Sequence, residues 1–269
     1  MHGRTPAHHL HERTPAAGGE APVHVLNANG RQGLLIVCDH ASAHVPAAYG
    51  LLGLPPETFE RHIAYDIGAA ALAESLARAL NAPAVLAGFS RLLIDPNRGL
   101  DDPTLIPALS DGTVIPANHP LSVDERARRI AGFHAPYHAA IDAALGRALI
   151  RGTTPSILSL HSFTGRWKGV RRPWQAGILW NRDARLAAPL LAALRVDGDL
   201  SVGDNEPYSG ALAGDCMDRH GTARGLAHAL VEVNQDLIGD AAGVAAWTVR
   251  LARVIEGILG RVDAAGAKA

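Results

Sequence analysis

Two histidines, His40 and His161, each end a short apolar run whose composition favours a buried β-strand. The runs begin at residues 34 and 156, and helical segments follow both along the chain, as expected of a parallel α/β sheet. Ligands of such sheets bind beyond the carboxyl ends of the strands, so both imidazoles are expected at one edge. Imidazole is the commonest metal ligand in proteins. The pair therefore predicts a metal site, whereas either histidine alone is equally a hydrogen-bonded core residue.

A catalytic zinc site uses three protein ligands and leaves one position open, so the two histidines need a partner. Asp66 is the leading candidate, because a carboxylate among apolar residues must be paired or metal-bound if it is buried. A solvent-exposed Asp66 is the alternative, since most aspartates are exposed. His62 lies four residues earlier on the same face of a predicted helix. It is an alternative ligand or a substrate-binding residue.

Metal-assisted hydrolysis also needs a general base, and Glu232 is the candidate. It lies in the apolar run 229–233, where a lone carboxylate is unfavourable without a partner. An active-site position supplies that partner. A structural ion pair with an arginine such as Arg224 is the alternative.

The elements that must position these residues alternate between strand and helix, which predicts the α/β class. Apolar runs predict strands at 34–40, 84–86, 91–94, 156–161, 176–180 and 227–233. Helical spacing predicts helices at 57–80, 186–194 and 243–262. A capping box at Ser122 and Glu125 opens another helix. Pro136 is expected to break or kink it before it resumes over 141–150.

The bulk composition fits a single catalytic domain over 31–269 of the 269 residues. Residues 1–30 are expected to be a disordered leader, since they lack the apolar segment of a signal peptide. The formal charge of -1 argues against a nucleic-acid-binding surface, and no apolar stretch is long enough to span a membrane. Two cysteines do not suggest a disulfide framework, so the expected compartment is the cytoplasm.

Two other classes of function stay open on the sequence alone. A serine or cysteine hydrolase would use Ser162 or Cys38 with a histidine, but the sequence has no Gly-x-Ser-x-Gly motif. A non-catalytic protein that binds acidic metabolites on the same fold is the second class. A further ligand pair, His134 and His138, is four residues apart, but the intervening Pro136 disfavours it.

Seven short motifs follow one another over residues 34–238. They are CDHAS at 38–42, HIAYDIGA at 62–69, SRLLIDPNR at 90–98, PYH at 136–138, LHSF at 160–163, DNEPYS at 204–209 and VEVNQDLI at 231–238. The strand 158–163 and the motif 95–98 are similar to the ligand-bearing strand and the substrate-carboxylate clamp of zinc carboxypeptidases. As an ordered set, the motifs resemble those of the N-formylglutamate amidohydrolase family. No single motif is specific, but their order along the chain is.

The resemblance implies a three-layer α/β/α fold with a mostly parallel mixed sheet, of the zinc-exopeptidase (phosphorylase/hydrolase-like) type. It implies hydrolysis of an N-formyl or other N-acyl amino acid, with N-formyl-L-glutamate giving formate and L-glutamate; another small amide is the alternative. Zn²⁺ or another divalent metal would be held by His40, Asp66 and His161, with Glu232 as the base. The residues expected to bind substrate are Arg91, Asn97, Arg98, His138, Asn205 and Tyr208.

Two positions depart from the family pattern. Asn234 stands where a basic residue is expected, and His44 stands where an asparagine is usual. The general expectation is a role in amino-acid catabolism. The two departures leave open which acyl group and which amino acid the substrate contains, and whether the role is in histidine degradation. The expected partner is a small-molecule substrate, and the sequence leaves the oligomeric state open.

Overall fold

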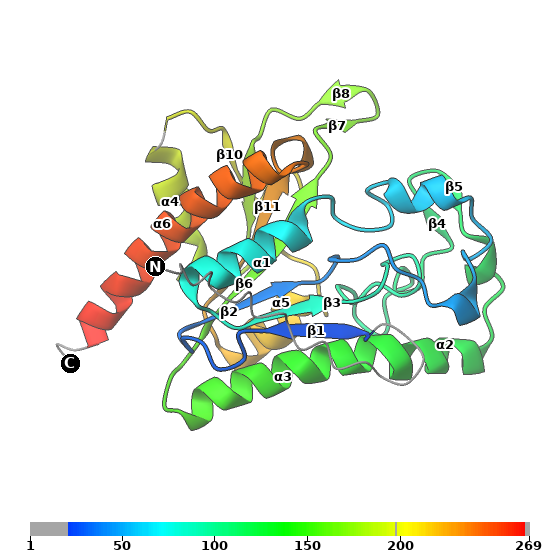
Figure 1. Cartoon of the computed structure of the whole chain (residues 1–269), viewed down its shortest axis with the longest axis horizontal. Helices are drawn as coiled ribbons and strands as arrows, with labels where there is room; N and C mark the ends of the chain where they lie inside the picture. The colour runs from blue at the N-terminus through cyan, green and yellow to red at the C-terminus, as the bar shows by residue number, and fades with distance from the viewer. Residues whose placement is uncertain (1–20, 197, 267–269) are drawn as a thin grey trace, which may run out of the picture.

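A mostly parallel, seven-stranded sheet forms the centre of the protein (Figure 1). The computed structural model describes residues 21–196 and 198–266. The strands of the sheet are, in chain order, β1 (Val23–Leu26), β2 (Leu34–Cys38), β3 (Ala84–Ala87), β6 (Ser156–Phe163), β9 (Ala176–Leu179), β10 (Val202–Asp204) and β11 (His228–Asn234). Their spatial order is β1-β3-β2-β6-β11-β9-β10. The pairs β1/β3 and β9/β11 are antiparallel, and the other neighbours are parallel.

Helices cover both faces of this sheet. One face carries α1 (Ala69–Leu80), α4 (Ala187–Val196) and α6 (Ala241–Gly266). The other carries α3 (Ala135–Ile150), which follows α2 (Val123–Arg129), and the short α5 (Cys216–His220). Successive residues of a strand point to opposite faces, so Leu158 and Leu160 of β6 join the core under α1 and α6, and Ile157 joins the core under α3. The predicted α/β class, with a three-layer arrangement and a mostly parallel mixed sheet, is confirmed.

Short elements decorate the loops between the main elements. Two hairpins are formed by β4 (Leu109–Ser110) with β5 (Thr113–Val114), and by β7 (Arg166–Trp167) with β8 (Val170–Arg171). Five short 3-10 turns are η1 (Ala47–Tyr49), η2 (Pro56–Glu60), η3 (Pro116–Asn118), η5 (Thr222–Arg224) and η6 (Gln235–Leu237). The loops that carry β4/β5 and β7/β8 lie beyond the carboxyl end of the parallel strands (Figure 1).

The predicted helix over 57–80 is wrong in its first half. Only α1 is α-helical there, and Asp66 lies in the turns between η2 and α1. The helix begins after Gly68, whose φ of 80° is left-handed and whose missing Cβ leaves room for the Ile238 carbonyl oxygen. The backbone N–H of Asp66 donates to the His40 carbonyl oxygen at 2.9 Å. This bond ties the turn to the end of β2, which a continuous helix would not allow.

Two further local predictions are wrong. Residues 91–94, predicted as a strand, form a turn in which the Ser90 hydroxyl accepts a hydrogen bond from the Leu92 N–H at 3.2 Å. The predicted break at Pro136 is absent, because a π-helical turn over Ile130–His134 joins α2 to α3. A π-turn widens the helix just ahead of Pro136, where the proline ring would otherwise meet the preceding turn. Ser122 caps α2 through Glu125 N–H, as predicted.

The remaining predicted elements are present with ends shifted by a few residues. They are the strands at 34–40, 84–86, 156–161, 176–180 and 227–233 and the helices at 186–194 and 243–262. The stretch 1–30, predicted as a leader, includes the edge strand β1, and its residues 1–20 lie outside the described part of the chain. Within the described part, every helix is too short or too polar to cross a membrane.

Candidate active site

Three adjacent strands of the sheet deliver the residues that the sequence singles out. Asp39 and His40 follow β2 directly, and His161 lies in β6. Glu232 lies in β11, where the parallel register places it beside His161. Register partners in neighbouring strands project from the same face of a sheet, so both side chains point toward the layer that contains α3 and α5.

His40, Asp66 and His161 form a buried cluster of metal-ligand type. One donor atom from each lies within 4.8 Å of the other two. The Oδ2 atom of Asp66 is 3.4 Å from Nδ1 of His40 and 2.8 Å from Nδ1 of His161. Asp66 is only 5% exposed, which rules out the solvent-exposed alternative. His62 instead has its Nε2 atom 3.6 Å from Oδ2 of Asp111.

The hydrogen bonds around His40 determine which of its ring nitrogens faces the cluster. Nε2 lies 2.7 Å from Oδ1 of Asp95, and Nδ1 lies 3.1 Å from Nη1 of Arg91. A guanidinium only donates, so Nδ1 must accept and Nε2 must carry the proton that it donates to Asp95. Nδ1 therefore carries a lone pair on the side of the ring that faces Arg91 and, at 3.4 Å, Oδ2 of Asp66. This pattern of imidazole and outer carboxylate is typical of a metal ligand.

His161 has the same arrangement with a different carboxylate. Its Nε2 donates to Oδ2 of Asp39 at 2.9 Å, and its Nδ1 faces Oδ2 of Asp66 at 2.8 Å. Asp39 is fully buried and also accepts from the hydroxyls of Tyr137 and Ser159. Although burial opposes it, the hydrogen bonds to Asp39 and Asp66 raise the pKa of His161 well above its ordinary value. A metal can replace the proton on Nδ1, so the three residues fit a divalent cation.

Replacing Asp95 with asparagine tests the arrangement around His40. We expect Asp95→Asn to weaken metal binding by about 10- to 100-fold, because the outer carboxylate orients the ligand and raises its basicity. Competition of the metal-loaded protein with a chelator measures this affinity. Asp101→Asn, on an exposed loop, is the matched control and should bind metal as the wild type does. Equal affinities for the wild type and the Asp95→Asn variant would contradict the assignment.

Glu232 lies beside this cluster with an unsatisfied carboxylate. The residue is 6% exposed, and its Oε2 atom is buried with no hydrogen-bond partner among the described residues. Burial raises the pKa of Glu232 to about 7, partly offset by the positive charge of His161. A buried polar atom without a partner is unfavourable, and such groups concentrate at functional sites. The structural ion pair with Arg224 is absent, because Arg224 Nη2 contacts Asp142 at 2.6 Å.

A cavity of about 290 Å³ opens over the cluster, a size that suits a small molecule. It brings together most of the residues predicted from the sequence, namely His40, His62, Asp66, Arg91, Asn97, Arg98, His161, Tyr208 and Glu232. Arg91 is held by the carboxylates of Asp95 at 2.9 Å and Asp66 at 3.5 Å. At the mouth, the Tyr208 hydroxyl accepts from Arg172 Nη1 at 3.0 Å.

Two predicted substrate-binding residues do not line this cavity. The Oδ1 atom of Asn205 accepts from the backbone N–H groups of Trp180 and Gly210, at 3.0 and 2.9 Å. Asn205 thereby shapes the loop that carries Tyr208. His138 is 1% exposed and its Nδ1 atom lies 2.8 Å from Nε2 of His220. The structure thus places His138 in a separate cluster behind the cavity wall.

The two candidate nucleophiles of the alternative hydrolase class have other environments. The hydroxyl of Ser162 donates to the carbonyl oxygen of Ile67 at 2.8 Å. Cys38 is fully buried in the core under α1 and α6, and burial together with the charge of Asp66 raises the pKa of its thiol well above the ordinary value. A protonated thiol is a poor nucleophile. The geometry therefore favours metal chemistry over a serine or cysteine mechanism.

Sequence reasoning missed the two outer carboxylates, Asp39 and Asp95. Both are almost fully buried, and each bonds one histidine of the cluster. Asp39 directly precedes His40 in the chain but accepts a hydrogen bond from His161. Asp95 accepts a hydrogen bond from His40, which lies 55 residues away in the sequence. The sequence feature that could have revealed them is an aspartate within an apolar run, because a buried carboxylate needs a partner. The identity of that partner depends on the packing of the strands.

Asp215, at the cavity wall, gives a prediction on stability. It caps α5 through the Asp218 N–H, and burial raises its pKa to about 6 from 3.8. The folded state therefore holds this proton more tightly than the unfolded chain, and the associated stability is lost as pH rises from about 4 through 6. Asn is an equally good cap. We expect Asp215→Asn to match the wild type near pH 4 and to exceed its unfolding free energy by about 2 to 3 kcal/mol at pH 8.

Urea unfolding of the chelator-treated proteins at both pH values measures the difference between the two variants. Titratable groups that both proteins share contribute equally to both free energies of unfolding. The change with pH in the difference between these free energies therefore reports on Asp215. A difference that is the same at pH 4 and pH 8 would contradict the raised pKa.

Comparison with known proteins identifies relatives of this chain in sequence and in fold. The sequence model of the N-formylglutamate amidohydrolase family matches residues 32–239. The gene product Atu2144 from Agrobacterium tumefaciens is 32% identical with a TM-score of 0.86, over 90% of this chain and 96% of that chain. N-formylglutamate amidohydrolase from Ralstonia eutropha JMP134 is similar in fold, with 24% identity and a TM-score of 0.70 over 91% of this chain and 99% of that chain. A search of curated proteins gave no match.

Proposed function

Because the chain belongs to the N-formylglutamate amidohydrolase family, we propose that it hydrolyses N-acyl amino acids in a metal-dependent reaction. The first substrate we propose is N-formyl-L-glutamate, which gives formate and L-glutamate. The observation that carries the proposal is the Oε2 atom of Glu232, which has no partner in the described part of the chain and lies beside His40, Asp66 and His161 in one cavity. A base and a set of metal ligands at one small-molecule site are the parts that amide hydrolysis requires.

The ligands of the metal would be His40, Asp66 and His161, with Zn²⁺ as the first candidate. When bound, such a metal acts as a Lewis acid that polarises a carbonyl group and makes water more acidic. Two neutral imidazole nitrogens and one carboxylate are donors that suit Zn²⁺. The outer carboxylates of Asp95 and Asp39 hold the two imidazoles in position.

Glu232 would move the protons of the reaction. A base is most effective when its pKa lies near the working pH, and burial raises the pKa of Glu232 to about 7. Its carboxylate accepts a proton from the attacking water and returns this proton to the nitrogen of the leaving amino acid. The burial of Glu232 also keeps bulk water from competing for that proton.

The cavity also offers a binding site for the carboxylate groups of the substrate. Arg91 is paired with Asp95 at 2.9 Å and with Asp66 at 3.5 Å, whereas Arg98 has a longer contact of 3.9 Å with Asp102. Arg98 is therefore the stronger candidate for this role. Arg98 lines the cavity beside Asn97 and is braced by Thr104, whose hydroxyl accepts from Nε at 3.2 Å. A guanidinium binds a carboxylate through two parallel hydrogen bonds. Arg91, next to the metal ligands, is placed to stabilise negative charge on the carbonyl oxygen.

The test is an assay of the metal-loaded protein against a panel of N-formyl and N-acetyl amino acids, with quantification of the released amine. We expect release from acidic N-formyl amino acids, loss of release with a chelator, and recovery on addition of Zn²⁺. Release that is insensitive to the chelator would exclude the metal mechanism. Tight binding of acidic N-acyl amino acids without release would indicate a binding protein instead of an enzyme.

A further inference from the structure

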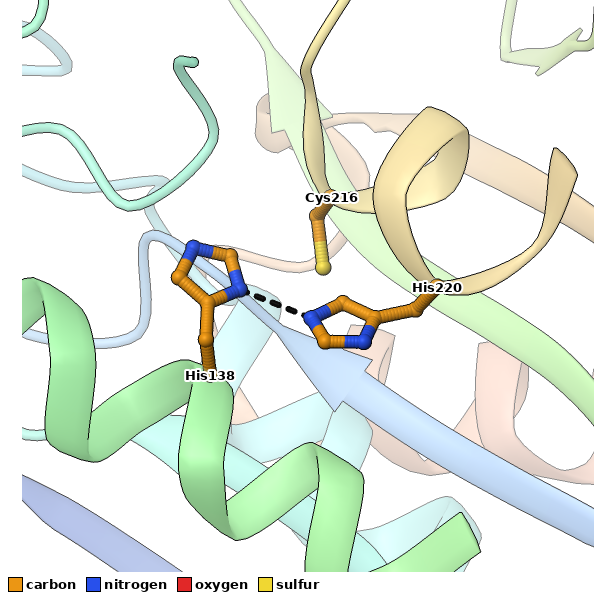
Figure 2. Close-up of side chains that lie close together, drawn as sticks. All are labelled: His138, Cys216 and His220. Atoms are coloured by element: carbon orange, nitrogen blue, oxygen red, sulfur yellow. Dashed lines mark hydrogen bonds between the residues drawn. The ribbon is translucent and has the colours of Figure 1, made fainter. Parts of the chain in front are cut away.

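A second cluster of metal-ligating side chains lies behind the wall of the cavity. Figure 2 shows His138 of α3 facing Cys216 and His220, the first and last residues of α5. One ligand atom from each lies within 4.8 Å of the other two, and the side chains are 1%, 0% and 0% exposed. We propose that these three residues form a second metal site, which takes a thiophilic cation such as Zn²⁺.

The polar contacts of His138 and His220 require one more proton than two neutral imidazoles carry. Nδ1 of His138 lies 2.8 Å from Nε2 of His220. The outer nitrogens also face oxygen atoms: Nε2 of His138 is 3.1 Å from the Pro96 carbonyl, and Nδ1 of His220 is 3.1 Å from a carboxylate oxygen of Asp142. Three contacts need three protons, but two neutral imidazoles carry only two. Two protons satisfy the first two contacts, which leaves Nδ1 of His220 facing the Asp142 carboxylate without a proton. In the structure this contact is not a hydrogen bond, and Nδ1 of His220 is buried without a hydrogen-bond partner among the described residues.

A third imidazole does not supply the missing proton. Nε2 of His134 lies 3.2 Å from Nε2 of His138 and 3.1 Å from the Arg98 carbonyl oxygen. The proton on Nε2 of His134 is donated to the Arg98 carbonyl oxygen. If it were donated to Nε2 of His138 instead, that nitrogen would have to accept, and it could no longer donate to the Pro96 carbonyl oxygen.

A cation between the two inner nitrogens resolves this shortage. It replaces the proton shared by Nδ1 of His138 and Nε2 of His220, so each imidazole keeps its own proton on the outer nitrogen. Those outer N–H groups then donate to the Pro96 carbonyl and to Asp142, which is the pattern that His40 and His161 show in the active site. Tetrahedral Zn–N bonds of about 2.1 Å separate two nitrogens by about 3.4 Å. The 2.8 Å contact would therefore widen by a small rotation of the rings.

Cys216 makes the site selective for thiophilic ions. In the metal-free protein burial and the adjacent Asp39 raise the pKa of its thiol well above the ordinary value. Binding releases this one proton to solvent as the thiolate becomes a ligand. Two imidazoles and a thiolate suit Zn²⁺ or Cu⁺ and disfavour Mg²⁺ and Ca²⁺, which prefer oxygen ligands.

The position of the cluster suggests what a metal would do there. The backbone N–H of Cys216 donates to Oδ1 of Asn97 at 3.0 Å, and His138 contacts the Pro96 carbonyl. A metal would thus join α3 and α5 to the segment 95–98, which carries the proposed substrate clamp. It would position Asn97 and Arg98 without touching the substrate.

Metal content and a spectroscopic signature test the proposal without any reference to activity. The full-length protein is stripped with a chelator and reloaded with Zn²⁺ or Co²⁺, and unbound metal is removed before elemental analysis. We expect the wild type to retain one more equivalent of metal than Cys216→Ser or His220→Gln. We also expect the Co²⁺ protein to show a thiolate-to-cobalt charge-transfer band that Cys216→Ser lacks and Cys38→Ala keeps. Cys38 is the matched control because it is the other cysteine and is equally buried.

The His161→Ala variant separates this site from the proposed active site. It should keep the charge-transfer band and one equivalent of metal, and a chelator should lower its melting temperature. If the proposed active site binds no metal, the wild type would hold one equivalent, which Cys216→Ser loses and His161→Ala keeps. Absence of the band from the reloaded wild type would overturn the second site, as would full metal retention by Cys216→Ser. The band is measured on the wild type itself, so a variant that fails to fold does not remove the test.

Discussion

Replacing Glu232 with glutamine should lower kcat for the N-acyl amino acid by about 10²- to 10⁴-fold, the usual contribution of a general base. Glutamine keeps the shape of the side chain but cannot accept the proton of the attacking water. The metal ligands are untouched, so metal content should remain that of the wild type. Steady-state release of the amine, with metal content measured on the same samples, gives both values.

The stability of this variant distinguishes a catalytic from a structural carboxylate. Glu232 has a buried oxygen that no described residue hydrogen-bonds, so Glu232→Gln should unfold at the same or a higher urea concentration than the wild type. A structural ion pair would predict the opposite. Glu256→Gln, on the exposed side of α6 across the sheet, is the control and should change neither activity nor stability. Turnover of every N-acyl substrate at the wild-type rate would remove Glu232 from the mechanism.

Replacing His161 with alanine should abolish stable metal binding at the active site. Loss of an outer carboxylate alone weakens binding by about 10- to 100-fold, so loss of a ligand should exceed about 100-fold. Asp39 and Asp66 would also lose the imidazole between them. Elemental analysis should find one equivalent less metal than in the wild type, and amine release should fall to the uncatalysed rate.

Two further variants decide the third ligand. Asp66→Ala should lose the same equivalent of metal as His161→Ala, because its Oδ2 atom faces both imidazoles. His62→Ala should retain it, because His62 contacts Asp111 instead. Retention in Asp66→Ala together with loss in His62→Ala would reverse the assignment. Circular dichroism of each variant shows whether it keeps the fold.

The strands that carry chemistry were predictable because their apolar runs are unambiguous. β2, β6 and β11 occur where the sequence places them, with His40, His161 and Glu232 at or near their carboxyl ends. The turn that carries Asp66 and the turn over 91–94 were not predictable, since local helix or strand propensity there is outweighed by contacts with distant segments. The Asp66 N–H bonds the end of β2, and the Ser90 N–H donates to the His44 carbonyl oxygen at 2.7 Å.

The family and the types of the candidate site residues were accessible from the sequence alone, because ordered motifs need no knowledge of packing. The family model matches residues 32–239. The partners of those groups were decided only by the tertiary structure. Asp39, adjacent to His40 in the chain, bonds His161 instead, and His138, which the motif suggests for substrate, faces Cys216 and His220 behind the cavity. Such pairings depend on strand register and helix placement, which local sequence does not specify.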